Sequence, residues 1–167
     1  MLRVILDTNI YSFIVKDKNT KEITEKIKNN KELKIYGYKL IKEEIKNTPK
    51  SRKYEDRKYR TLLINLYFSL IKEQYSELPN IKGLAEDYYK EFKRLGGNRS
   101  FEDIRIDFEI VACATIHNLD LIISDDEKTL KGDVALEAYK NVNLKNKMKT
   151  PNFYNYEDLK KIIGLSV

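Results

Sequence analysis

The first apolar run of the chain predicts a buried strand that ends at a carboxylate. Residues 2–6 (Leu-Arg-Val-Ile-Leu) are rich in branched side chains, which is typical of a strand covered on both faces in a parallel sheet. Asp7-Thr8-Asn9 follows, and these residue types favour helix N-caps, so a helix is expected from residue 10. Asp7 then lies at the carboxyl end of the strand, where open α/β folds bind ligands. A purely capping role for Asp7 fits the same pattern.

Hydrophobic periodicity along the rest of the chain predicts an alternation of helices and short strands. Asparagine pairs, glycines and prolines divide the segments. Further helices are expected at 20–29, 38–47, 62–75, 84–95, 103–118, 133–144 and 156–163, and further strands at 33–36 and 121–124. This alternation indicates an α/β protein.

The helix expected at 38–47 carries an inward-facing acid. At about 100° per residue, Leu40, Ile41 and Ile45 share one side of the helix. Glu44 falls within this apolar arc, whereas Glu43 points to the far side and is expected to be solvated. A carboxylate facing inward is costly unless it is paired or binds a cation. A Glu44 at the edge of the arc, paired with a lysine, is the alternative.

The helix expected at 103–118 is apolar around most of its circumference and should therefore be central. Ser100 and Asp103 have capping-box spacing, which gives Asp103 a structural role. Asp107 is in register with the apolar residues of the helix, so it needs a cation or several hydrogen-bond donors. Glu109 is expected to point away and to be solvated.

The strand expected at 121–124 also ends in carboxylates, Asp125-Asp126. Ser124 and Glu127 have capping-box spacing, which explains part of this acidity but not both aspartates. If the strands are parallel, these acids converge with Asp7 at one edge of the sheet. Several carboxylates together repel one another unless a divalent cation neutralises them, and oxygen ligands suit Mg²⁺ or Mn²⁺. Such a site favours metal-assisted cleavage of phosphodiester bonds.

Composition narrows the chemistry further. The 167 residues are expected to form a single domain, and a net charge of +6 favours an anionic partner such as nucleic acid. Cys113 is the only cysteine and His117 the only histidine, which argues against a disulfide, a cysteine- or histidine-rich zinc site and a Ser-His-Asp triad. We found no glycine-rich phosphate loop. No apolar run is long enough for a membrane span, and no signal peptide is recognised, so a cytoplasmic protein is expected.

The segment after Pro49 is basic with interleaved tyrosines, as expected of a surface that follows a phosphate backbone and stacks on unpaired bases. A solvated helix start is the alternative. The candidate RNA-binding residues are Lys50, Arg52, Lys53, Arg57, Lys58 and Arg60.

Four segments together resemble the acidic motifs of PIN-domain ribonucleases, most closely the VapC-type toxins of VapBC toxin–antitoxin pairs. They are Val4-Ile-Leu-Asp-Thr-Asn-Ile10, Leu40-Ile-Lys-Glu-Glu-Ile45, Ile106-Asp-Phe-Glu-Ile-Val-Ala-Cys-Ala114 and Leu121-Ile-Ile-Ser-Asp-Asp126. Their order and their strand or helix context agree with the family, and the resemblance spans residues 2 to 130.

The resemblance implies a three-layer α/β/α fold with a mainly parallel sheet, and an Mg²⁺- or Mn²⁺-dependent endoribonuclease. It makes Asp7, Glu44, Asp107 and Asp126 the metal-binding and catalytic acids, with Asp125 as an alternative fourth ligand. Asn9 and Ser124 become supporting groups that orient ligands or water. A small antitoxin protein and a homodimer are the implied partners, beside the RNA substrate. The segment 49–98 is longer than the compact toxins need, which suggests a basic, helical insertion.

Other functions fit parts of the pattern. Phosphatases of the haloacid-dehalogenase type also begin with an aspartate after a strand, but they usually carry a second aspartate two residues later, where this chain has Asn9. A PIN-like module could bind RNA or protein without catalysis, and a PIN nuclease could process RNA outside any toxin–antitoxin pair. In a purely structural domain, the acids would lie scattered.

Overall fold

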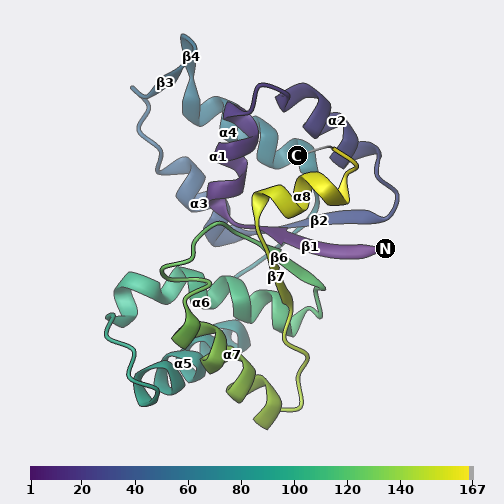
Figure 1. Cartoon of the computed structure of the whole chain (residues 1–167). Coiled ribbons are helices and arrows are strands. Elements are labelled where there is room, and N and C mark those ends of the chain that lie inside the picture. The colour runs from purple at the N-terminus through teal and green to yellow at the C-terminus, as the bar shows by residue number, and fades with distance from the viewer. Residues whose placement is uncertain (166–167) are drawn as a thin grey trace.

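The computed structural model describes residues 1–165, which form a five-stranded parallel sheet with helices on both faces (Figure 1). The strand order is β5-β2-β1-β6-β7. The strands of this sheet are β1 (Leu2–Leu6), β2 (Leu33–Tyr38), β5 (Ile71–Tyr75), β6 (Leu121–Ile123) and β7 (Asn152–Tyr154). The helices are α1 (Thr8–Lys16), α2 (Thr20–Asn29), α3 (Lys39–Lys46), α4 (Tyr59–Leu70), α5 (Pro79–Arg94), α6 (Phe101–Ile116), α7 (Asp133–Lys145) and α8 (Tyr156–Ile162).

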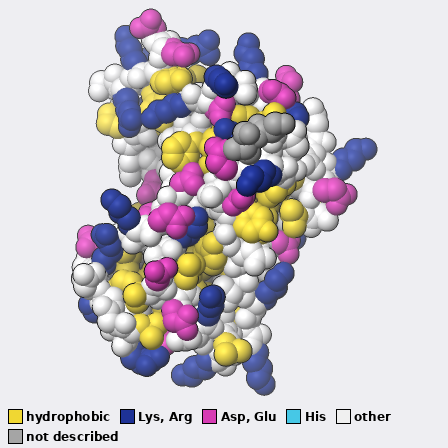
Figure 2. Space-filling view, viewed as in Figure 1, with side chains coloured by type: hydrophobic (Ala, Val, Ile, Leu, Met, Phe, Trp, Pro, Cys, Tyr) yellow, Lys and Arg dark blue, Asp and Glu magenta, His cyan; other side chains and the backbone are white. Residues whose placement is uncertain are grey.

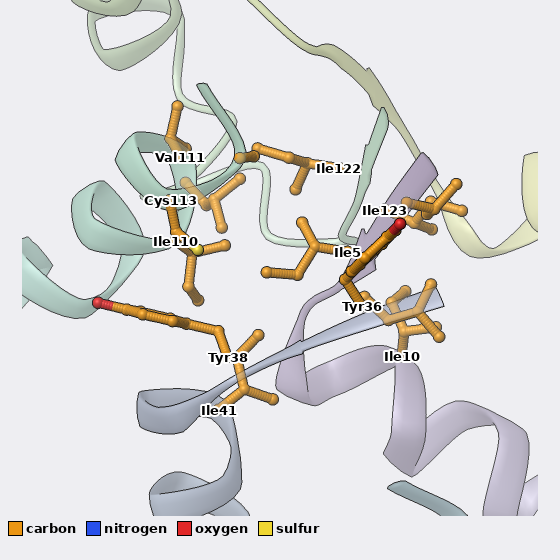
Figure 3. Close-up of a cluster of buried hydrophobic side chains, with 14 of the residues drawn as sticks. Ile5, Ile10, Tyr36, Tyr38, Ile41, Ile110, Val111, Cys113, Ile122 and Ile123 are labelled. Atoms are coloured by element: carbon orange, nitrogen blue, oxygen red, sulfur yellow. The ribbon is translucent and has the colours of Figure 1, made fainter. Parts of the chain in front are cut away.

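The helices form two layers, with α1 to α4 and α8 on one face of the sheet and α5 to α7 on the other (Figure 1). Strand β1 is central because it pairs with β2 on one side and β6 on the other, with Ile5 opposite Tyr36 and Ile122. Ile5 and Ile122 lie on the side of the sheet that faces Ile110 of α6 (Figure 3). The expected three-layer α/β/α fold with a mainly parallel sheet is thus confirmed.

The parallel arrangement brings the carboxyl ends of β1, β2 and β6 to one edge of the sheet. Asp7 follows β1 directly, and its backbone N–H donates to the carbonyl of Ile123 at the end of β6, at 2.9 Å. Helix α3 begins directly after β2. The residues that follow these strands therefore lie around the same edge.

Two strands at the edges of the sheet were not expected from the sequence. The predicted helix at 62–75 is wrong at residues 71–75, because α4 ends at Leu70 and β5 begins at Ile71. β7 follows Pro151 and pairs with β6. Residues 71–75 (Ile-Lys-Glu-Gln-Tyr) form an edge strand in which three polar residues follow one another, so the sequence shows no strand-like alternation.

The basic segment is a hairpin rather than the start of a helix. β3 (Lys53–Tyr54) pairs with β4 (Arg57–Lys58) in antiparallel fashion, and the turn residues Glu55 and Asp56 have φ values of 47° and 61°. Two consecutive positive φ values are typical of a two-residue hairpin turn. The expected insertion at 49–98 is therefore only partly helical: it consists of this hairpin, α4, β5 and α5.

Glu109 is buried, whereas the sequence predicted a solvated side chain. Its side chain is 2% exposed and forms an ion pair with Arg105 at 2.9 Å. The Tyr38 hydroxyl donates to Glu109 Oε2 at 3.0 Å. Tyr38 ends β2, so this contact fixes α6 against the carboxyl edge of the sheet.

We therefore expect Tyr38→Phe to lower the free energy of unfolding by about 2 kcal/mol, because a buried carboxylate loses one of its donors. Urea unfolding measures the loss. Tyr54→Phe removes an exposed hydroxyl that donates to the Lys16 carbonyl at 3.3 Å and serves as the control, with an expected loss below about 0.5 kcal/mol. Equal losses in the two variants would contradict the structural role of the Tyr38–Glu109 contact.

Across residues 1–165, no helix combines the length and the apolar character that crossing a membrane requires.

Candidate active site

Asp7 is held in place by hydrogen bonds from three residues. Its carboxylate accepts from the Thr8 N–H at 2.7 Å, Asn9 Nδ2 at 2.8 Å and Ser124 Oγ at 2.7 Å. The side chain is 6% exposed. Asp7 also caps α1, so the capping role expected as an alternative is present. Oδ2 of its carboxylate is the oxygen held by Asn9 and Ser124, which ties the end of β1 to the end of β6.

Glu44 approaches the same edge from α3. Thr8 at the start of α1 donates its hydroxyl to Glu44 Oε2 at 2.6 Å. Glu43 behaves as expected for a solvated charge, because its side chain is 46% exposed and pairs with Lys39 at 3.7 Å. The helical phase thus predicted the orientations of both Glu43 and Glu44.

Asp126 lies in the turn after β6, where the backbone holds its carboxylate. Oδ1 accepts from the N–H groups of Lys128 and Thr129, at 3.0 and 2.9 Å, and the Thr129 hydroxyl donates to Oδ2. The Thr129 side chain also acts on Asp107 of α6, whose pKa it lowers. Thr129 therefore influences both aspartates.

Asp125 is oriented differently from its neighbour. Asp125 Oδ1 accepts from the Tyr156 N–H at 3.4 Å, which ties it to the start of α8. The expected Ser124–Glu127 capping box is wrong, because no helix begins here. Ser124 Oγ accepts from the Asp126 N–H at 3.0 Å instead, while it donates to Asp7. Of the two adjacent aspartates, Asp126 is the one whose charge acts on Asp7 and Asp107.

Burial and mutual repulsion shape the electrostatics of these four acids. Burial, together with the charges of Asp7, Asp126 and Glu44, raises the pKa of Asp107 to about 7 against the opposing effect of Thr129. Burial likewise raises the pKa of Asp7 to about 6, opposed by the bonds from Ser124 and Thr8. Burial also raises the pKa of Glu44. The pKa of Asp126 is low: burial raises it, but the donors from Thr129 and Lys128 outweigh burial. Four acids thus lie within electrostatic range of one another.

The donor chemistry of this cluster suits a divalent cation. All four groups offer carboxylate oxygens, the ligands of Mg²⁺ and Mn²⁺, and a cation would relieve the repulsion that raises the pKa values of Asp7 and Asp107. Their present spacing does not complete a ligand cage: within residues 1–165, no three Asp, Glu, His or Cys side chains are grouped so as to hold a metal ion. Bound metal would therefore have to draw the carboxylates closer together.

The comparisons with known proteins bear on the fold. No family model matches the sequence, and the search of curated proteins finds no match either. The structure is similar to one chain in the crystal structure of VapBC2 from Rickettsia felis bound to a DNA fragment from their promoter. The similarity covers 92% of this chain and 98% of that chain, with a TM-score of 0.55 and 11% identity. The likeness is one of fold.

Ser124 offers a test of how the cluster is supported. We expect Ser124→Ala to weaken Mn²⁺ binding by about 10- to 100-fold, the usual effect of losing a group that orients a metal ligand, because Asp7 loses its hydroxyl donor. Calorimetric titration with Mn²⁺ measures the change. Ser100→Ala, which removes the cap of α6, is the control and should leave the affinity unchanged. Equal affinity of the native protein and Ser124→Ala would contradict a supporting role.

Other expected residues lie outside the cluster. His117 stacks on Tyr75, with ring centroids 3.6 Å apart, and Arg3 at the amino end of β1 donates to the His117 carbonyl at 2.9 Å. The position of His117, beside the amino ends of the strands, agrees with a structural role for this residue. The basic residues from Lys50 to Lys58 are exposed on and beside the β3–β4 hairpin, while Arg60 is partly buried in α4.

Three residues that shape the site were not expected from the sequence. Thr8 and Thr129 donate to carboxylates of the cluster, and the charge of Arg99 helps to lower the pKa of Asp126. Thr8 stands inside the Asp7-Thr8-Asn9 segment, where it was interpreted only as a capping residue type. Thr129 and Arg99 lie in irregular segments without periodicity, so no sequence signal identified them.

Proposed function

We propose that the protein is a divalent-metal-dependent endoribonuclease that hydrolyses RNA phosphodiester bonds at the carboxyl edge of its sheet. The observation that carries the proposal is the group of four acids at this edge, Asp7, Glu44, Asp107 and Asp126. Hydrogen bonds from Ser124, Thr8 and Thr129 hold Asp7, Glu44 and Asp126, and the charges of these three acids raise the pKa of Asp107. Burying several like charges together is costly, and a bound divalent cation would offset this cost. Phosphodiester cleavage is the reaction that an all-carboxylate metal site in a basic protein supports best.

Each side chain has a role in this proposal. Asp7, Glu44, Asp107 and Asp126 would hold Mg²⁺ or Mn²⁺, which supplies a nucleophilic water at neutral pH and neutralises charge on the phosphate. Asn9 and Ser124 orient Asp7 through their hydrogen bonds. Thr8 and Thr129 do the same for Glu44 and Asp126. No histidine takes part, in agreement with the remote position of His117.

The basic hairpin supports RNA as the substrate, because an acidic cluster by itself repels a phosphate backbone. The end of the molecule that carries β3 and β4 displays many lysine and arginine side chains (Figure 2). Arg52 lies over the ring of Tyr59, with 4.7 Å between its guanidinium carbon and the ring centroid. We assign RNA contacts to Lys50, Arg52, Lys53, Arg57, Lys58 and Arg60 by charge and by the exposure of most of them.

We further propose that this nuclease is the toxin of a toxin–antitoxin pair. The fold similarity to a chain of the VapBC2 complex supports this reading. In that case a small antitoxin would cover the cleft at the carboxyl edge, and the protein would form a homodimer. An RNA-processing nuclease without an antitoxin would share the same site and differ only in partner.

A second candidate is a PIN-like module that binds RNA or protein without catalysis. It is favoured by one observation, that within residues 1–165 the acids are not grouped tightly enough to hold a metal ion as they stand. A binding module needs the basic surface but not the carboxylates.

Cleavage of a structured RNA in the presence of Mn²⁺, and again with excess EDTA, separates these candidates. A nuclease should cut the RNA only when Mn²⁺ is available. Glu43→Gln, which removes the solvated neighbour of Glu44, should cut as well as the native protein. RNA binding without any metal-dependent cleavage would favour the binding module.

A further inference from the structure

A cavity of about 320 Å³ lies beside the carboxylate cluster, between the end of α5, the start of α6 and the turn after Asp126. Two of its lining residues connect it to the cluster. Thr129 donates to Asp126, and Arg99 lies close enough for its charge to act on the Asp126 carboxylate. The cavity therefore adjoins the carboxylate cluster and is not a separate site.

The residues that line the cavity include buried apolar side chains and two exposed cationic side chains. Phe92, Ile104 and Ala135 are 7%, 1% and 1% exposed and form part of its wall. Arg99 and Lys128 also line it and are exposed. Asp133 is the one acidic residue among its lining residues. Such a cavity suits a ligand with an apolar flat part and an anionic group.

Two glycines shape the mouth of the cavity. Gly96 ends α5 with a φ of 92°, a conformation that side chains disfavour. A Cβ atom on Gly97 would overlap the ring of Phe92, so the chain can cross the ring closely only with glycine there. The Tyr89 hydroxyl then donates to the Arg99 carbonyl at 3.3 Å and fixes the loop that carries the guanidinium. Arg99 is thus placed at the mouth by local packing.

We propose that this cavity binds one nucleotide of single-stranded RNA next to the phosphate that is cleaved, an inference that rests on the proposed nuclease function. The base would pack against the apolar part of the lining, where Val134 is 36% exposed, and the adjoining phosphate would pair with Arg99 and Lys128. The volume is at the lower end of small-molecule sites, so it admits a single base and no duplex. Arg99 and Lys128 also offset the repulsion between the RNA backbone and the nearby acids.

Binding of a fluorescently labelled single-stranded hexaribonucleotide, measured by anisotropy without added metal, tests the assignment. Arg99→Gln removes one positive charge that would pair with the RNA phosphate, so we expect it to weaken binding about tenfold. Val134→Glu, which adds a negative charge at the exposed rim of the cavity, should do the same. Inorganic phosphate at the same concentration should not displace the RNA, because it lacks the base.

Arg94→Gln is the matched control, since Arg94 is 66% exposed, pairs with Glu91 at 2.6 Å and does not line the cavity. It should change the affinity by less than twofold. Binding by Arg99→Gln and Val134→Glu that equals binding by Arg94→Gln would overturn the cavity assignment, and it would leave the nuclease proposal intact if the native protein still cuts RNA. A native protein that neither binds nor cuts RNA would overturn both.

Discussion

Replacing Asp107 by asparagine is expected to abolish RNA cleavage and, at the same time, to stabilise the metal-free protein. Asparagine keeps the size of the side chain but removes one charge from a cluster in which Asp7, Glu44 and Asp126 all act on Asp107. Loss of a group that merely supports a metal ligand already costs about 10- to 100-fold. Loss of a ligand itself should therefore reduce cleavage by at least about 100-fold, measured as initial rates with Mn²⁺.

The control for this variant is Asp103→Asn, which makes the same change on the exposed first turn of the same helix. It should cut RNA at the native rate. Cleavage by Asp107→Asn at more than a tenth of the native rate would contradict a catalytic role for the cluster. Because folding is expected to improve, a loss of cleavage could not be attributed to unfolding.

The second large effect concerns stability and pH. The pKa of Asp107 is raised from 3.8 to about 7 in the folded protein, so the folded state binds its proton more tightly than the unfolded state does. Between these two pH values, ionisation of Asp107 lowers the free energy of unfolding of the native protein as the pH rises. Above pH 7 the loss is complete, and at about 1.4 kcal/mol for each unit of pKa it is on the order of 4 kcal/mol.

The difference in unfolding free energy between Asp107→Asn and the native protein isolates this one group from the other carboxylates. With EDTA present, the variant should gain stability over the native protein progressively from about pH 4 to pH 7 and then keep a constant advantage. Urea unfolding at several pH values gives the curve. Asp103→Asn should show no such slope, and a flat difference for Asp107→Asn would mean that the carboxylate is not destabilised by its neighbours.

The three central strands and the helices that cover the sheet could be predicted from the sequence, but the two edge strands could not. The run at residues 2–6 is apolar because β1 is paired on both sides and covered on both faces. β5 and β7 pair on one side only, so both are partly exposed, and β5 carries the polar run Lys72-Glu73-Gln74. In the case of β5, the apolar spacing of α4 also runs into the strand without a helix-breaking residue.

Within the site, the helical phase predicted inward positions for Glu44 and Asp107, and burial raises the pKa of both side chains. It failed for Glu109, since α6 is buried around nearly its whole circumference and has no solvated side to which a glutamate can point. The choice between Asp125 and Asp126 depends on a turn, where hydrogen bonds to Tyr156, Lys128 and Thr129 orient the carboxylates. The contact with Tyr156 joins distant segments, and the contacts with Lys128 and Thr129 belong to an irregular turn, so none of them leaves a periodic trace in the sequence.

The central claim is that the carboxyl edge of the sheet holds a divalent cation, and Mn²⁺ binding tests it most directly. Electron paramagnetic resonance of free Mn²⁺ at pH 7.5 measures binding without any need for an RNA substrate. The account predicts that the native protein and Asp103→Asn bind Mn²⁺ and that Asp107→Asn binds it at least about tenfold more weakly. Equal binding by all three proteins, or none by the native protein, would contradict a metal centre at these carboxylates.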